Sequence, residues 1–96
     1  MKISRWQQVN GKDAGELKLY ALSTCGWCRR AKQFLNEAGV AYSYIDVDLL
    51  PDQEQDKLAA EVMKWNPAET YPTIVINGEK GFLATDTERL QKELGL

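Results

Sequence analysis

Short apolar runs alternate with apolar positions at helical spacing along most of this 96-residue chain. Residues 17–22 are mostly apolar, which predicts a short buried strand. After them, apolar side chains recur at helical spacing at Cys28, Ala31, Leu35 and Ala38. Gly39 is suited to end a helix there because glycine adopts the left-handed conformation easily. We therefore expect a strand over 17–22 and then a helix that ends at Ala38.

The middle of the chain repeats this order of strand and helix. Residues 42–47 are rich in aromatic and β-branched side chains, which predicts a second strand. A second helix is expected to begin near Pro51 and to end at Asn66-Pro67. Its apolar stripe at helical spacing, which is expected to face the core, consists of Leu58, Val62 and Trp65.

The last third of the chain predicts a hairpin and one more helix. Residues 73–76 are apolar or β-branched, and Asn77-Gly78 after them predicts a tight turn into a short strand at 80–83. Thr85, with Glu88 three residues later, fits a capping box at the start of a helix. The core face of that helix is expected to consist of Leu90 and Leu94.

Residues 1–16 are mostly polar and are expected to form an N-terminal extension to a domain that covers residues 17–96. Three apolar side chains of the extension are candidates to dock on the domain, with an extra edge strand as an open alternative: Ile3, Trp6 and Val9.

The order of the elements favours a single α/β domain. A strand, a helix and a second strand form a βαβ unit, which requires parallel strands and a right-handed crossover. The hairpin adds two antiparallel strands, so we expect a mixed four-stranded sheet in the order β-α-β-α-β-β-α, with helices packed on it. This is the minimal thioredoxin-like fold.

Composition and charge exclude several classes of function. The chain has 12 basic and 14 acidic residues, a net charge of −2 and no basic run, which argues against nucleic acid as a partner. No stretch approaches the roughly 18 apolar residues that span a membrane, and the N-terminus lacks the apolar stretch of a secretory signal. We therefore expect a cytoplasmic protein. We also expect it to be a monomer. Histidine is absent, which excludes Cys-His and Ser-His catalytic pairs.

The two cysteines, Cys25 and Cys28, are the candidate catalytic residues. A disulfide between them would close a loop too short to add much stability. Cys25 stands where the first helix begins, and free N–H groups at a helix N-terminus favour the thiolate, which is the nucleophile of disulfide exchange. Cys28 lies nearly one turn later, on the apolar stripe, and should be the more buried of the two. Cys25 is thus expected to attack a disulfide and Cys28 to resolve the mixed disulfide.

Other interpretations of these residues stay open at this stage. Two cysteines at this spacing are also typical of half a zinc site, but such a site needs four ligands and the chain has no further Cys or His. Trp27, between the cysteines, either contacts substrate or extends the apolar stripe. Arg29 and Arg30 either favour the thiolate or are ordinary solvated charges.

Thr70-Tyr71-Pro72 precedes the strand at 73–76. One interpretation is an ordinary proline at the start of a strand. The other is a cis bond between Tyr71 and Pro72 that turns the chain beside the cysteines. The N–H and C=O of Tyr71 would then be free to pair with a substrate chain as a strand does.

The sequence at this point resembles the glutaredoxin family over roughly residues 17–94. The motifs that carry the resemblance are Leu19-Tyr20-Ala21, Cys25-Gly26-Trp27-Cys28, Thr70-Tyr71-Pro72, Thr73 to Gly78, Gly81-Phe82 and Thr85-Asp86. Membership implies the thioredoxin fold, Cys25 as nucleophile and Pro72 in cis. It also implies that the Tyr71 main chain binds the cysteinyl part of a glutathionyl group, and that Thr85 and Asp86 hold its γ-glutamyl end.

The sequence departs from the family pattern at several positions. Gly26 and Trp27 stand where glutaredoxins commonly have Pro and Tyr, and Asp86 is preceded by one extra residue. Leu22 stands where most members have a lysine that pairs with a glutathione carboxylate. Gly81-Phe82 is similar to the glutaredoxin-like donors that serve ribonucleotide reductase and take electrons from a reductase protein.

These observations together predict an enzyme, a thiol–disulfide oxidoreductase that reduces protein or glutathione-mixed disulfides by dithiol exchange at Cys25 and Cys28. We expect no metal and no bound cofactor, with glutathione as a candidate co-substrate. The expected partners are disulfide-containing proteins and an electron donor, either a reductase or a small thiol. The alternative is a [2Fe–2S] carrier that binds its cluster through Cys25 in a dimer. Gly26 keeps this alternative open, because glycine at this place is a feature of several such family members.

Overall fold

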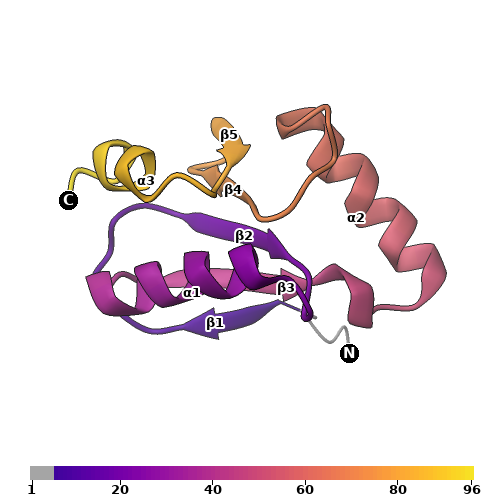
Figure 1. Cartoon of the computed structure of the whole chain (residues 1–96), viewed down its shortest axis with the longest axis horizontal. Helices are drawn as coiled ribbons and strands as arrows, with labels where there is room; N and C mark the ends of the chain where they lie inside the picture. The colour runs from indigo at the N-terminus through magenta and orange to yellow at the C-terminus, as the bar shows by residue number, and fades with distance from the viewer. Residues whose placement is uncertain (1–5) are drawn as a thin grey trace.

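The computed structural model describes residues 6–96, which form a sheet with helices on both faces (Figure 1). The strands are β1 (Gln7–Val9), β2 (Leu17–Ala21), β3 (Tyr42–Asp46), β4 (Thr73–Ile76) and β5 (Lys80–Leu83). The helices are α1 (Gly26–Ala38), the short 3-10 helix η1 (Val47–Leu49), α2 (Asp52–Trp65) and α3 (Thr87–Glu93). The predicted α/β fold is thus confirmed. None of these helices is long and apolar enough to cross a membrane.

Within the described residues the sheet has five strands in the order β1-β3-β2-β4-β5, not the four that the sequence predicts. β2 and β3 are parallel, as the βαβ unit requires, and the other neighbours are antiparallel. The additional strand β1 pairs with the outer edge of β3, with Val9 opposite Tyr42. Its sequence signal is weak because Gln7 and Gln8 are exposed and only Val9 is partly buried. Ile3 lies outside the described residues, and the boundary between 1–16 and 17–96 stays a prediction.

The core consists of two clusters of buried side chains, one on each face of the sheet. Ile74 and Ile76 of β4 belong to the cluster that includes residues of α1 and α3, whereas Val75 belongs to the cluster that includes α2. This alternation follows from the two-residue period of a strand. β4 is buried throughout because helices cover it on both faces.

The predicted ends and turns are largely confirmed. Gly39 has φ of 70° and ends α1 as its C-cap. Asn77 and Gly78 have φ of 56° and 63°, and the Glu79 N–H donates to the Ile76 carbonyl at 3.1 Å, which makes the predicted tight turn. Trp65 packs on the α2 side of the core, as expected.

The sheet has two ends, where its strands begin or finish. The parallel strands β2 and β3 finish at the same end, and Thr73, where β4 begins, lies opposite both Tyr20 and Leu83. The segments that leave β2, β3 and β5 therefore gather with the segment that enters β4. We call this end of the sheet the cysteine end, because Cys25 follows β2 there. We call the opposite end, with the loop at residues 10–15 and the turn at 77–79, the turn end.

Candidate functional site

Cys25 lies at the cysteine end as the N-cap of α1, with extended backbone angles. Its Sγ accepts a hydrogen bond from the N–H of Cys28 at 3.2 Å, and its own N–H donates to the Leu22 carbonyl at 3.3 Å. The side chain is partly exposed. The Cys25 sulfur therefore faces the N-terminus of α1 and the Cys28 N–H, two groups that carry partial positive charge.

Cys28 is fully buried, one turn into α1. The N–H of Leu22 donates to its Sγ at 3.4 Å. Burial raises the pKa of the Cys28 thiol to about 12, and its hydrogen bond with Cys25 also raises it, whereas the positive charge of Lys32 opposes this rise. The two thiols are free. The site thus pairs an accessible sulfur with a buried one that stays protonated at neutral pH.

The segment before β4 lies at the same end of the sheet. The Tyr71–Pro72 bond is cis, as predicted, and Pro72 is buried. The Ala84 N–H donates to the Pro72 carbonyl at 2.7 Å, which ties this segment to the residue after β5. Within residues 6–96, neither the N–H nor the C=O of Tyr71 has a main-chain partner. These two groups are available to a chain that binds in extended form.

The Tyr71 ring lies near enough to Cys28 for a charge on that cysteine to act on the Tyr71 hydroxyl. Burial raises the pKa of the Tyr71 hydroxyl, and the charges of Glu69 and Cys28 raise it further. Thr70 is held from α2, because the Asn66 amide donates to its Oγ1 at 2.9 Å and to its carbonyl at 3.2 Å. The structure therefore brings Thr70, Tyr71 and Pro72 to the same end of the sheet as Cys25 and Cys28.

Trp27 is 52% exposed, so the interpretation that it extends the apolar stripe of α1 is wrong. The Arg30 guanidinium lies 4.9 Å from the centre of its ring. An exposed aromatic ring between the two cysteines is consistent with a substrate contact. That role stays a prediction.

Asp86, rather than Thr85, is the N-cap of α3. Its Oδ1 accepts hydrogen bonds from the N–H groups of Glu88 at 3.0 Å and Arg89 at 3.2 Å. The capping box predicted for Thr85 and Glu88 is therefore wrong, because the neighbouring aspartate caps the helix instead. Thr85 and Asp86 follow Ala84 and so lie at the cysteine end, where their binding of a glutathionyl group stays a prediction.

Two pairs of polar side chains at this end were missed in the sequence. Asp48 of η1 accepts hydrogen bonds from the Ser23 N–H at 2.7 Å and from its hydroxyl, and these bonds hold the pKa of the Asp48 carboxyl below its usual value. Lys32 of α1 forms an ion pair with Asp46 at 2.9 Å, with both side chains largely buried. A signal existed for the acidic partners, because Asp46 ends β3, which is parallel to β2, and Asp48 follows two residues later in η1.

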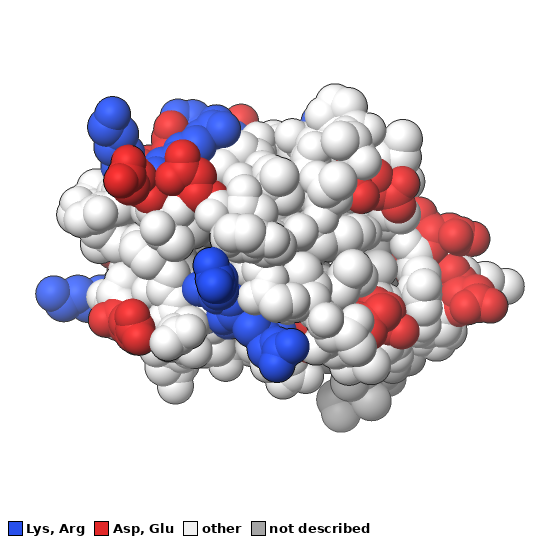
Figure 2. All heavy atoms as spheres, viewed as in Figure 1, with Lys and Arg blue, Asp and Glu red and all other residues white. Residues whose placement is uncertain are grey.

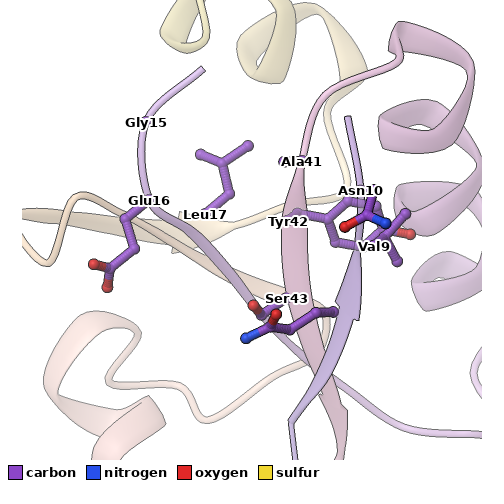
Figure 3. Close-up of a pocket in the computed structure, with 9 residues that line it drawn as sticks. Val9, Asn10, Gly15, Glu16, Leu17, Ala41, Tyr42 and Ser43 are labelled. Carbon is purple, nitrogen blue, oxygen red and sulfur yellow. The ribbon is translucent and has the colours of Figure 1, made fainter. Parts of the chain in front are cut away.

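The turn end also has a hollow of about 250 Å³, lined by parts of β1, β2 and β3 (Figure 3). Among residues 6–96, Glu16 is its one charged lining side chain, and neither cysteine lines it. Within residues 6–96, no group of three or more His, Cys, Asp or Glu side chains is placed to hold a metal ion.

Comparisons with known proteins agree with the geometry. The family model described as Glutaredoxin matches residues 17–80. The chain is 34% identical to the mitochondrial glutaredoxin-2 of Bos taurus over 77 residues, which is 78% of this chain and 46% of that protein. It is 31% identical to glutaredoxin 1 of Rickettsia prowazekii, covering 78% of this chain and 76% of that protein. The chain spans about half the length of most curated relatives it matches.

Two archaeal crystal structures are similar to the whole fold. The glutaredoxin of Methanosarcina mazei Go1 has a TM-score of 0.88 and 35% identity, and the match covers 97% of this chain and 90% of that one. The methanoredoxin of Methanosarcina acetivorans has a TM-score of 0.86 and 35% identity, with 90% of each chain covered.

Proposed function

Since the chain belongs to the glutaredoxin family, we propose that it is a thiol–disulfide oxidoreductase that reduces protein disulfides through Cys25 and Cys28. The observation that carries this proposal is the pairing of a partly exposed sulfur at a helix N-terminus with a fully buried sulfur one turn later. A dithiol enzyme needs one sulfur that reaches the substrate and one that waits behind it.

The reaction divides between the two sulfurs. The Cys25 thiolate attacks one sulfur of the substrate disulfide, the other substrate sulfur leaves and takes up a proton, and a mixed disulfide forms. Cys28 then loses its proton and attacks Cys25, which releases the second substrate thiol. The substrate gains two electrons, and the protein is left with a Cys25–Cys28 disulfide. The unpaired main chain of Tyr71 aligns the substrate segment during both steps, and the exposed ring of Trp27 contacts it.

In this proposal, the electron donor that restores the dithiol is a reductase protein or a small thiol. The small thiol is one whose binding does not require this protein to recognise a carboxylate of the donor. Leu22 supplies no positive charge for a glutathione carboxylate. Phe82 stands where a glycine is common in the family, but its ring is buried in the core and gives no argument about the donor. We place this activity in the cytoplasm, where such donors are kept reduced.

A coupled assay tests the proposal. The protein is supplied with a disulfide substrate and NADPH, together with either thioredoxin reductase or glutathione and glutathione reductase. We expect turnover with thioredoxin reductase and slower turnover with glutathione. If the protein, reduced beforehand, fails to reduce any disulfide offered to it, the proposed function is wrong.

The alternative role as a [2Fe–2S] carrier stays a prediction. Open space surrounds the position of a side chain at Gly26, next to Cys25. Visible absorbance of the purified protein, together with its molar mass in solution, distinguishes a coloured dimer from the colourless monomer that we propose.

A further inference from the structure

A groove of about 230 Å³ lies at the cysteine end. Leu22 and Tyr71 form part of its wall. The main chain of Leu22 is hydrogen-bonded to the Cys25 N–H and to the Cys28 Sγ, and the Tyr71 main chain is unpaired within residues 6–96. A substrate segment that reaches Cys25 along Tyr71 therefore passes this groove.

The groove is acidic. Asp48, Asp56 and Glu69 line it, and no Lys or Arg among residues 6–96 does. Asp48 is held in place by its two hydrogen bonds from Ser23. Glu69 is close enough for its charge to raise the pKa of the Tyr71 hydroxyl. Asp56 and Glu69 are exposed, so their carboxylates are free to meet a charged substrate group.

The acidic character extends over the neighbouring helices. Residues 46–69, which cover η1 and α2, contain seven acidic and two basic side chains, although the whole chain has nearly equal numbers of each. Figure 2 shows several acidic side chains at the end of the molecule occupied by α2 in Figure 1. The cations nearest to Cys25 in the sequence, Arg29 and Arg30, belong to α1 and do not line the groove.

We propose that Asp48, Asp56 and Glu69 select by charge which disulfides reach Cys25. They favour protein segments that carry Lys or Arg beside the disulfide and disfavour anionic ones. The inference rests on the proposed function and names its substrate class. Charges within about 10 Å of one another interact at moderate salt, so carboxylates lining the approach to the sulfur act on both the encounter and the bound complex.

Single-turnover kinetics with three synthetic peptides test this selection. Each peptide contains the same cyclic Cys-Gly-Gly-Cys disulfide, flanked by two Arg, two Gln or two Glu residues. Protein reduced beforehand and freed of reductant is the only electron source: its dithiol becomes a disulfide as the peptide disulfide takes up two electrons and two protons. Acid quenching and chromatography give a second-order rate constant for each peptide.

The variants are chosen to separate local charge from net charge. Asp56→Asn and Glu69→Gln remove groove carboxylates on exposed side chains. Glu79→Gln is the matched control, because it changes the net charge equally at an exposed position of the turn end. Circular dichroism confirms that each variant is folded.

For the wild-type protein we expect the Arg peptide to react about tenfold faster than the Glu peptide at low salt, with the Gln peptide between them. Each groove substitution should lower this ratio by about two- to fivefold, as for an exposed ion pair. Glu79→Gln should leave the ratio unchanged, and 0.5 M salt should reduce it.

Equal rates for the three peptides, or a ratio that survives both groove substitutions together, would overturn the charge selection and leave the reductase activity standing. Failure of the wild-type protein to reduce even the Gln peptide would instead contradict the proposed function itself.

Discussion

The two ends of the sheet differ in how their main-chain polar groups are used. At the turn end, the Asn77 N–H donates to the Glu16 carbonyl at 2.7 Å, and the Glu16 N–H donates to the Asn77 side chain at 2.8 Å. Lys12 likewise donates to Gly39 at 2.7 Å and accepts from Ala41 at 2.8 Å. Matched pairs of hydrogen bonds hold these loops to one another.

At the cysteine end, by contrast, several polar groups are still free to bind a ligand. The Tyr71 main chain has no main-chain partner within residues 6–96, and the Cys25 sulfur is partly exposed at a helix N-terminus. The comparison shows that a hollow does not by itself make a site, because the turn end has one of similar volume. Unpaired groups beside a reactive sulfur are what distinguish the cysteine end.

The largest effect is expected for Cys25→Ser. This change should reduce disulfide reduction by at least about a thousandfold, because it removes the nucleophile. Stability should hardly change, because serine is also a good N-cap for α1. Single-turnover reduction and thermal unfolding measure the two quantities. Activity near that of the wild-type protein would remove Cys25 from the mechanism.

Alkylation of the reduced protein should differ strongly between the two sulfurs. At pH 7 iodoacetamide should modify Cys25 and leave Cys28 intact, because Cys28 is fully buried and its thiol has a pKa of about 12. Only the thiolate reacts, so the rate at Cys28 should rise about tenfold per pH unit until the pH nears 12. Mass spectrometry of peptides gives both rates, and equal rates at pH 7 would refute the assignment of roles.

Leu22→Lys should make the protein use glutathione more efficiently as its electron donor. A charge-assisted hydrogen bond to the glutathione carboxylate, worth about 1.5–3 kcal/mol, should raise the efficiency of glutathione-dependent reduction by about one to two orders of magnitude. Leu22→Met is the uncharged control. A wild-type protein as efficient with glutathione as typical dithiol glutaredoxins would show that the interpretation of Leu22 is wrong.

Gly11→Ala should disturb the turn end alone. A Cβ at Gly11 would lie 2.6 Å from the Gly39 carbonyl oxygen and 2.7 Å from the Ala41 nitrogen, so main chain must shift. We expect a loss of about 1–3 kcal/mol of unfolding free energy, with an unchanged single-turnover rate. Gly26→Ala is the control for stability, because within residues 6–96 no atom outside its chain neighbours and its own helix backbone lies within 4 Å of the added Cβ. Equal stability of the two variants in urea would contradict the close packing at Gly11.

Most of the fold was predictable because its signals are local. The stripe of α1 and the turn at Asn77-Gly78 depend on residues close in sequence, and both are confirmed. The edge strand β1 was only an open alternative in the sequence, because Gln7 and Gln8 carry no apolar pattern; the structure shows it, paired with β3 far along the chain. The cap of α3 was misassigned because two neighbouring residues, Thr85 and Asp86, are both suited to it.

The candidate site likewise has one part that the sequence predicts and another that only the structure shows. The cysteines and the cis proline follow from short motifs, so the sequence was enough to find them. The contacts of Asp48 with Ser23, and of Asp46 with Lys32, join segments at least 14 residues apart. The groove joins Leu22, α2 and Tyr71, which are brought together only by the packing of α2 on the sheet. The negative charge of the groove results from these separate segments, which only the fold brings together.

Trapping of the mixed disulfide tests the central claim most directly. The Cys28→Ser variant, mixed in reduced form with a linear Gln-flanked peptide whose single Cys forms a disulfide with 5-thio-2-nitrobenzoate, should accumulate a covalent adduct with the peptide. Cys25 displaces thionitrobenzoate, a weak nucleophile, and neither the protein nor the peptide then has a second sulfur to resolve the adduct. Peptide mapping by mass spectrometry should place the adduct on Cys25, and the Cys25→Ser variant should form almost none. An adduct that forms equally well on Cys28 in the Cys25→Ser variant would contradict the account.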